Sequence, residues 1–249
     1  MDTTRGIVHA LAAVQQRIAQ ACRTAGRDPR GVRLLLATKT VSPDKIRIAI
    51  QAGANLIAEN KVQEYKEKAA ALADLPVERH FIGHLQTNKI KEVIRYVSCI
   101  QSVDRMSLVE ELDKRLRATE RHMDILLQVN TSRECSKFGL DPEAVPDFFK
   151  QVAQYDTLRI KGLMTIGLFD TDPERVRPCF RQLKSLRDEL HRELPATAPP
   201  LELSMGMSGD LETAIAEGAT IVRVGTAIFG ARFYPDQYYW NENENKKTT

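Results

Sequence analysis

The sequence predicts an α/β protein built as a single (β/α)8 TIM barrel with an extra N-terminal helix. Its 249 residues match the roughly 250 that such a barrel commonly takes. Short apolar runs alternate with segments of helical periodicity, which is typical of parallel strands joined by helices. The runs number eight, and this favours a closed barrel over an open doubly wound sheet. We predict the barrel over residues 1–234 and a polar, disordered C-terminal tail over 235–249.

The extra helix is predicted over residues 5–25. Apolar residues recur there at spacings of three and four, so they share one face of a helix. Gly26 follows at the position where helices commonly end. The apolar face consists of Ile7, Leu11, Val14, Ile18 and Cys22.

After this helix the pattern changes to short apolar runs with alternation, which is the periodicity of strands. Each run is short enough to be one strand of a barrel. The predicted strands are 33–38, 54–58, 79–83, 98–103, 123–130, 158–166, 201–205 and 220–224.

Segments of helical period lie between these strands. Several begin with Ser-Pro, Asp-Pro or a polar cap such as Asp104, as helices commonly do. No GxGxxG motif follows the first strand, which argues against a dinucleotide-binding fold. The predicted helices are 43–52, 60–73, 88–96, 104–118, 141–154, 173–193 and 209–217.

Charge and hydropathy limit the partners of this chain. Its 36 basic and 33 acidic residues give a formal charge of +3, without the dense basic block that nucleic-acid binding favours. A small anionic ligand suits this balance better. No run approaches the roughly 18 apolar residues of a membrane span, and the N-terminus lacks the features of a signal peptide. We therefore expect a cytoplasmic monomer that binds neither nucleic acid nor membrane and holds no metal.

Lys39 ends the first predicted strand. Alternation places it on the same face as Leu35 and Ala37. If that face lines the barrel, the amine stands at the mouth of the barrel and loses hydration, which favours its neutral form and attack on an aldehyde. From this strand alone, a solvated lysine at a strand end is the simpler interpretation.

Two loops rich in small residues follow the last two predicted strands. The first is SMGMSGD (204–210), and the second is RVGTA (223–227). Hydroxyls and backbone N–H groups near helix starts bind anions, and barrels commonly hold phosphate in these two loops. The alternative is helix capping by Ser208 and a tight turn at Gly225. Two such loops in adjacent positions favour phosphate binding.

A lysine on the first strand facing these loops describes a pocket for a phosphorylated aldehyde. In a closed barrel the first strand adjoins the eighth, which brings the lysine close to these loops. Pyridoxal 5'-phosphate (PLP) is a phosphorylated aldehyde, so we predict it as the cofactor. Arg223, if it points inward, would approach the pyridine nitrogen. An arginine would not keep that nitrogen protonated as a carboxylate does, and this weighs against carbanion chemistry.

The chain contains, in this order, the segments LLLATKTVSP, AENKVQE, HFIGHLQTNKIK, LQVNTSRECSKFGL, GLMTIG, LSMGMSGDLETAIAEGAT and VRVGTAIFGAR. These seven segments closely resemble the pyridoxal phosphate homeostasis proteins, a family similar to the barrel domain of alanine racemase standing alone. The resemblance covers about residues 5–233. It implies that Lys39 forms the Schiff base, an internal aldimine, and that Arg223 lies near the pyridine nitrogen. It also implies that Ser204, Gly225 and Thr226 bind the phosphate and that Asn60 faces the cofactor.

Two positions depart from the family pattern. Ala58 stands where the family usually has glycine, and His84 stands where proline is often found, which leaves the contacts of the loop after the third strand open. His84 is interpreted as a backbone-bonded loop histidine or as a titrating group over the cofactor. Lys137 matches a family position and is interpreted as a surface ion-pair residue or as a lysine near the ring.

The resemblance implies a carrier that buffers the reactive aldehyde, supplies apoenzymes and influences amino-acid and keto-acid balance, without catalysis. The alternative is a PLP-dependent amino-acid racemase. Racemisation needs two positioned bases, whereas only Lys39 is identified and the chain ends soon after the eighth strand. A phosphosugar-binding barrel is a third hypothesis, and it would leave Lys39 without a role.

Overall fold

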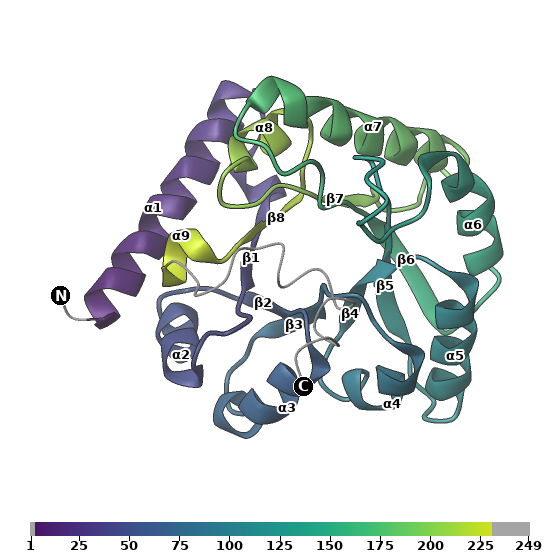
Figure 1. The fold of residues 1–249 in the computed structure, drawn as a ribbon, viewed down its shortest axis with the longest axis horizontal. Helices are drawn as coiled ribbons and strands as arrows, with labels where there is room; N and C mark the ends of the chain where they lie inside the picture. The colour runs from purple at the N-terminus through teal and green to yellow at the C-terminus, as the bar shows by residue number, and fades with distance from the viewer. Residues whose placement is uncertain (1–2, 231–249) are drawn as a thin grey trace.

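The computed structural model describes residues 3–230, and over this range the chain forms a closed barrel of eight parallel strands (Figure 1). The strands follow one another in chain order, and β8 pairs with β1 to close the barrel. Each predicted strand overlaps an observed one, so the predicted fold class is confirmed. The strands are β1 (Arg33–Ala37), β2 (Leu56–Glu59), β3 (Glu78–Phe81), β4 (Cys99–Val103), β5 (Met123–Gln128), β6 (Leu158–Met164), β7 (Glu202–Ser204) and β8 (Ile221–Val224).

Helices surround the barrel (Figure 1). The predicted extra helix is α1, which buries its apolar face against α2, α8 and α9. The helices are α1 (Thr3–Thr24), α2 (Pro43–Gln51), α3 (Val62–Lys68), α4 (Ile90–Val93), α5 (Met106–Arg117), α6 (Val145–Val152), α7 (Pro173–Arg192), α8 (Leu211–Ala216) and α9 (Thr226–Phe229).

Several helices are shorter than the predicted segments, and in the segment 141–154 a 3-10 turn over Pro142–Ala144 precedes α6. The segment 60–73 contains α3 followed by a 3-10 turn over Ala70–Leu72, and the segment 88–96 contains only α4 after a 3-10 turn over Thr87–Lys89. Helix α9 has no counterpart among the predicted helices, because four residues make little more than one turn and show no periodicity. The connections from β2 to β3 and from β3 to β4 are therefore made by short helices and 3-10 turns rather than by one long helix each.

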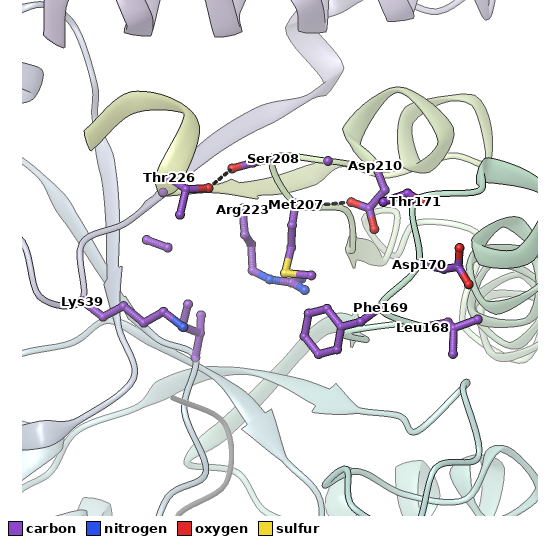
Figure 2. Close-up of a pocket in the computed structure, with 14 residues that line it drawn as sticks. Lys39, Leu168, Phe169, Asp170, Thr171, Met207, Ser208, Asp210, Arg223 and Thr226 are labelled. Carbon is purple, nitrogen blue, oxygen red and sulfur yellow. Dashed lines mark hydrogen bonds between the residues drawn. The ribbon is translucent and has the colours of Figure 1, made fainter. Parts of the chain in front are cut away.

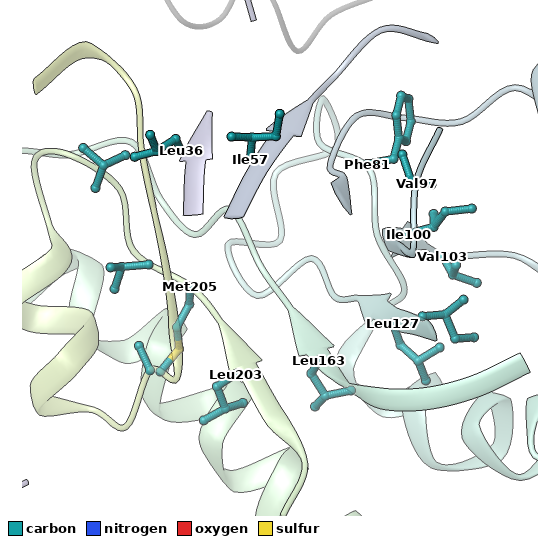
Figure 3. Close-up of a cluster of buried hydrophobic side chains, with 14 of the residues drawn as sticks. Leu36, Ile57, Phe81, Val97, Ile100, Val103, Leu127, Leu163, Leu203 and Met205 are labelled. Atoms are coloured by element: carbon teal, nitrogen blue, oxygen red, sulfur yellow. The ribbon is translucent and has the colours of Figure 1, made fainter. Parts of the chain in front are cut away.

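The strands present two apolar faces. Residues on the outer face, such as Leu36, Ile57 and Leu163, pack with the helices in one large core (Figure 3). Residues on the inner face form two smaller clusters in the lumen, one around Leu35 and Ala37 and one around Leu126 and Met164. Each fully buried aliphatic side chain contributes about 1.5–3 kcal/mol, so the outer layer supplies the larger share of apolar stabilisation.

The register of the closing pair brings the two ends of the chain together. Leu35 on β1 lies opposite Arg223 on β8, and Ala37 lies opposite Ala58 on β2. The inner-face alternation that places Leu35 and Ala37 in the lumen continues to Lys39. The first strand and the loop after the last strand therefore border the same end of the barrel.

Gly83, after β3, touches the loop after β2. A Cβ on Gly83 would lie 1.9 Å from the carbonyl oxygen of Asn60, far inside van der Waals contact. The same holds at Gly162 on β6, where a Cβ would lie 2.1 Å from the carbonyl oxygen of Glu202 on β7. Glycine is required at both positions because another backbone passes there.

No helix among residues 3–230 is both long and apolar enough to cross a membrane. These residues belong to one barrel. The predicted boundary between barrel and tail, at 234 and 235, lies outside the described residues.

Candidate ligand-binding site

A cavity of about 590 Å3 opens at the carboxyl ends of the strands, where barrel proteins keep their sites. Its size lies in the usual range of small-molecule sites, about 300–1,000 Å3. Its walls come from β1, β8 and the loops after β1, β3, β6, β7 and β8 (Figure 2). The lining residues are Ala37, Lys39, Ile82, Leu168, Phe169, Asp170, Thr171, Met207, Ser208, Gly209, Asp210, Arg223, Gly225 and Thr226.

Lys39 extends from the end of β1 into this cavity (Figure 2) and is only 2% exposed. Both of its neighbours are fixed by the adjoining elements. The Thr38 hydroxyl donates to Glu59 Oε1 at 2.7 Å, and the Thr40 amide donates to the Glu64 carboxylate at 2.9 Å. Thr40 has a φ of 63°, which turns the chain away from the barrel. The backbone at Lys39 is thus held from both sides.

A buried ionic cluster supports this strand end from outside the barrel. Lys68 Nζ donates to the Thr38 carbonyl and to Glu59 Oε1, both at 2.9 Å, and forms an ion pair with Glu64. Burial is the main cause that raises the pKa of Glu59 to about 7, and the Lys68 charge opposes it. Glu59 is therefore the group here that titrates near neutral pH.

Arg223 lies on the inner face of β8 and is 3% exposed. Its Nη1 donates to Ser204 Oγ at 2.9 Å, and its Nη2 donates to the Thr165 carbonyl at 2.8 Å. Burial lowers the pKa of Arg223 to about 10, while the nearby Asp210 charge opposes that shift. The side chain therefore stays cationic at neutral pH and places a positive charge in the cavity that also contains Lys39 (Figure 2).

The loops after β7 and β8 meet in one wall. Thr226 Oγ1 donates to Ser208 Oγ at 3.2 Å, and the Met207 amide donates to Asp210 Oδ1. Gly206 has a φ of 88°, and a Cβ there would lie 2.4 Å from the Ala214 Cβ. The first loop is therefore shaped by its glycine and its aspartate, and Ser208 is bonded to Thr226 rather than capping α8.

The structure brings together four of the six predicted site residues: Lys39, Arg223, Gly225 and Thr226 all line the cavity. Ser204 is fully buried beneath Arg223, and its hydroxyl donates to Gln101 Oε1 at 2.6 Å. Asn60 lines a neighbouring cavity of about 290 Å3 together with His84.

Ser208 lines the cavity, although it was not among the six predicted site residues. It is the second serine of SMGMS, and the signal that could have found it is its place in the loop, beyond the strand that holds Ser204. Phe169 and Met207 also line the cavity. Nothing in the sequence marks Phe169, because it lies just beyond the GLMTIG segment (162–167) that ends β6 and begins the following loop.

His84 and Lys137 lie beside the cavity without lining it. The His84 ring stacks on Phe138 with centroids 3.8 Å apart, and burial is the main cause that lowers its pKa. Lys137 Nζ donates to the Gly167 carbonyl at 2.7 Å and stands 4.5 Å from the centroid of the Phe169 ring. It also forms an ion pair with Glu134, and its side chain is only 11% exposed, so Lys137 is a paired and largely buried lysine beside the cavity.

Fold and site together define the class of protein. Residues 10–233 match the family described as the N-terminal domain of alanine racemase. A pyridoxal phosphate homeostasis protein of Aquifex aeolicus is 46% identical over 224 residues, which cover 90% of this chain and 97% of that protein. The chain belongs to the pyridoxal phosphate homeostasis protein family.

Solved structures agree with this assignment. An unknown protein from Bifidobacterium adolescentis is 42% identical, with a TM-score of 0.86 over 92% of this chain and 97% of that one. PipY of Synechococcus elongatus PCC7942 with PLP bound is 34% identical, with a TM-score of 0.77 over 90% of this chain and 100% of that one.

Proposed function

We propose that this protein binds PLP in the cavity at the barrel mouth and acts in PLP homeostasis. The observation that carries the proposal is that Lys39 and Arg223, both buried, face the same cavity of about 590 Å3. The names of its relatives and the PLP held by PipY support the choice of ligand.

The residues present fit this cofactor. PLP needs an amine for its aldehyde, donors for its phosphate and a partner for its ring nitrogen. Lys39 supplies the amine, and the bonded pair of Ser208 and Thr226 supplies hydroxyls beside Gly225. A guanidinium has five N–H donors, so Arg223 keeps donors for a ligand after its two bonds to protein.

When bound, the cofactor supplies an aldehyde that can be held covalently by a primary amine. An amine attacks an aldehyde only in its neutral form, and Lys39 is placed where bulk water is excluded. The proposal assigns the phosphate side to Ser208, Gly225 and Thr226. It assigns the pyridine-ring end of the cofactor to Arg223, whose guanidinium is held by its hydrogen bond to Ser204.

We also propose that the protein holds PLP without turning over amino acids. Arg223, rather than a carboxylate, is the charged group on the ring side. Among the described residues that line the cavity there is no Tyr, His or Cys to act as a base opposite Lys39. Asp210 accepts the Met207 amide, and Asp170 is paired with Arg175. The racemase alternative lacks a second positioned base in this part of the chain.

The physiological part of the proposal is a carrier that passes PLP to apoenzymes as a cytoplasmic monomer. The balanced charge of the chain suits a small anionic ligand and gives no support for nucleic-acid or membrane binding.

Titration of the purified protein with PLP, followed by gel filtration, tests the proposal. A visible absorbance that stays with the protein, and reactivation of a PLP-dependent apoenzyme by that complex, are expected. A protein that stays colourless at saturating PLP would contradict it.

A further inference from the structure

A chain of hydrogen bonds crosses the lumen of the barrel from the cavity floor to the opposite rim. Arg223 Nη1 lies 2.9 Å from Ser204 Oγ, which lies 2.6 Å from Gln101 Oε1. Gln101 Nε2 lies 2.7 Å from His80 Nδ1, and His80 Nε2 lies 2.6 Å from Glu78 Oε1. The four residues from Arg223 to His80 are at most 3% exposed. Strands β8, β7, β4 and β3 contribute to the chain.

The two end groups and the orientation of the Gln101 amide together fix the direction of the bonds in this chain. Arg223 can only donate, so Ser204 Oγ accepts from it and uses its single proton on Gln101 Oε1. The amide nitrogen of Gln101 then faces His80, and His80 Nδ1 must accept. At the far end a carboxylate can only accept, so His80 carries its proton on Nε2 and donates it to Glu78.

The far end is anchored at the amino end of the barrel. Glu78 forms an ion pair with Arg33 of β1. The hydrogen bond from His80 is the largest cause that lowers the pKa of Glu78, which keeps it an acceptor at neutral pH. Every bond in the chain is therefore satisfied, which is the condition under which a buried polar network rigidifies its members.

We propose that His80 and Gln101 are positioning residues that fix the guanidinium of Arg223 in the cavity. The proposal rests on the proposed function, in which Arg223 meets the ring of PLP. If the Gln101 amide turned over, its nitrogen would compete with Arg223 for the oxygen of Ser204, and the serine proton would lose its acceptor in the chain. The Nε2–H tautomer of His80 prevents this, although His80 does not line the cavity.

The first test does not depend on PLP. Long-range 1H–15N spectra of the histidine rings identify the protonated nitrogen of each ring in the ligand-free protein. The expected result is a neutral His80 with the proton on Nε2, and an altered His80 signal in Gln101→Leu. A proton on Nδ1 would overturn the direction of the chain, and with it the proposal.

The second test is a double-mutant cycle on PLP affinity. Gln101→Leu and Ser204→Ala are each measured in the wild-type background and in the Arg223→Ala background. In wild type each should weaken binding about tenfold, as loss of support for a charge-assisted bond predicts. In Arg223→Ala each should change affinity less than twofold, because the group they position is gone. Equal losses in both backgrounds would assign a merely structural role and reject the proposal.

Gln128→Leu is the matched control, since Gln128 is a buried glutamine whose Nε2 bonds to the Phe138 carbonyl outside this chain. Its effect should be the same in both backgrounds. If Gln101→Leu does not fold, the double-mutant cycle is measured with Ser204→Ala, which removes only one oxygen atom. If wild type itself fails to bind PLP, the proposed function fails, and the histidine spectra alone then decide whether the chain has the direction inferred.

Discussion

Thr226 Oγ1 donates a hydrogen bond of 3.2 Å to Ser208 Oγ, joining the loops after β8 and β7 in one wall of the cavity. This pair places two hydroxyls side by side next to Gly225. Barrels commonly bind phosphate in these two loops. Because Thr226 uses its proton on Ser208, the Ser208 hydroxyl is the side-chain donor that the pair can offer to a phosphate.

Ser208→Ala should weaken PLP binding about 10- to 100-fold, because a hydrogen bond to a charged group contributes about 1.5–3 kcal/mol. The same variant should leave the affinity for pyridoxal, which has no phosphate, almost unchanged. Fluorescence titration with both ligands measures this ratio.

Ser204→Ala is the matched control for that experiment. Ser204 bonds to Arg223 and Gln101 and does not line the cavity, so it should weaken both ligands by the same factor. If Ser204→Ala lowered the affinity for PLP but not for pyridoxal, Ser204 would be a phosphate-binding residue, as the family resemblance implies.

Lys39→Ala should abolish covalent capture of PLP, because no other lysine lines the cavity among the described residues. Borohydride reduction followed by peptide mass mapping should place the label on Lys39 in wild type and yield no site-specific label in the variant. Lys114→Ala, on the exposed face of α5, is the control and should label like wild type. Stoichiometric label on another residue would refute the assignment.

Wild type should not turn over amino acids. Racemisation, decarboxylation and transamination should stay at the rate of free PLP, since the ring side carries Arg223 and no base is placed opposite Lys39. A chiral assay with several amino acids, run beside Lys39→Ala, measures this. A rate near the usual enzyme median of about 10 per second would establish the racemase alternative.

Glu59 should make stability depend on pH. Its pKa is raised from 4.5 to about 7, so the folded state holds this proton more tightly than the unfolded state, and the stability from it is lost as pH rises through that window. The contribution is on the order of 3 kcal/mol at most. Glu59→Gln cannot titrate, so its stability relative to wild type should rise between pH 5 and pH 8. Urea denaturation at both pH values measures this.

The exposed Glu110→Gln on α5 is the control for loss of a charge in that experiment. A difference between Glu59→Gln and wild type that stays constant with pH would contradict the prediction.

Gly83→Ala should destabilise the protein by about 1–3 kcal/mol, because its Cβ would lie 1.9 Å from the Asn60 carbonyl oxygen. Gly6→Ala is the matched control, since a Cβ there has no atom within 4 Å and the residue lies in α1. It should stabilise by about 0.5–1 kcal/mol. The thermal unfolding midpoints of the two variants are compared with that of wild type. Equal midpoints would show that the loop containing Asn60 moves aside without a cost in stability.

Much of this molecule is determined by local patterns in its sequence. The period of two in the strands and the three- and four-residue spacing in α1 fixed the elements and their order, because side-chain direction in a strand or helix depends only on neighbouring residues. The same rule placed Lys39 on the inner face of β1 beside Leu35 and Ala37. A closed barrel then required β1 to meet β8, which brought Lys39 and Arg223 to one cavity.

Only the tertiary structure decided which serine faces the cavity and what holds Arg223. Ser204 and Ser208 lie four positions apart in one motif, and their roles differ because the chain leaves the strand between them. His80 and Gln101 come from the neighbouring strands β3 and β4, whereas Ser204 comes from β7, and no spacing in the sequence links Ser204 to them. The contact between Ser204 and Gln101 exists only after the barrel closes, since a hydrogen bond across the lumen depends on the distance between strands and not on position along the chain.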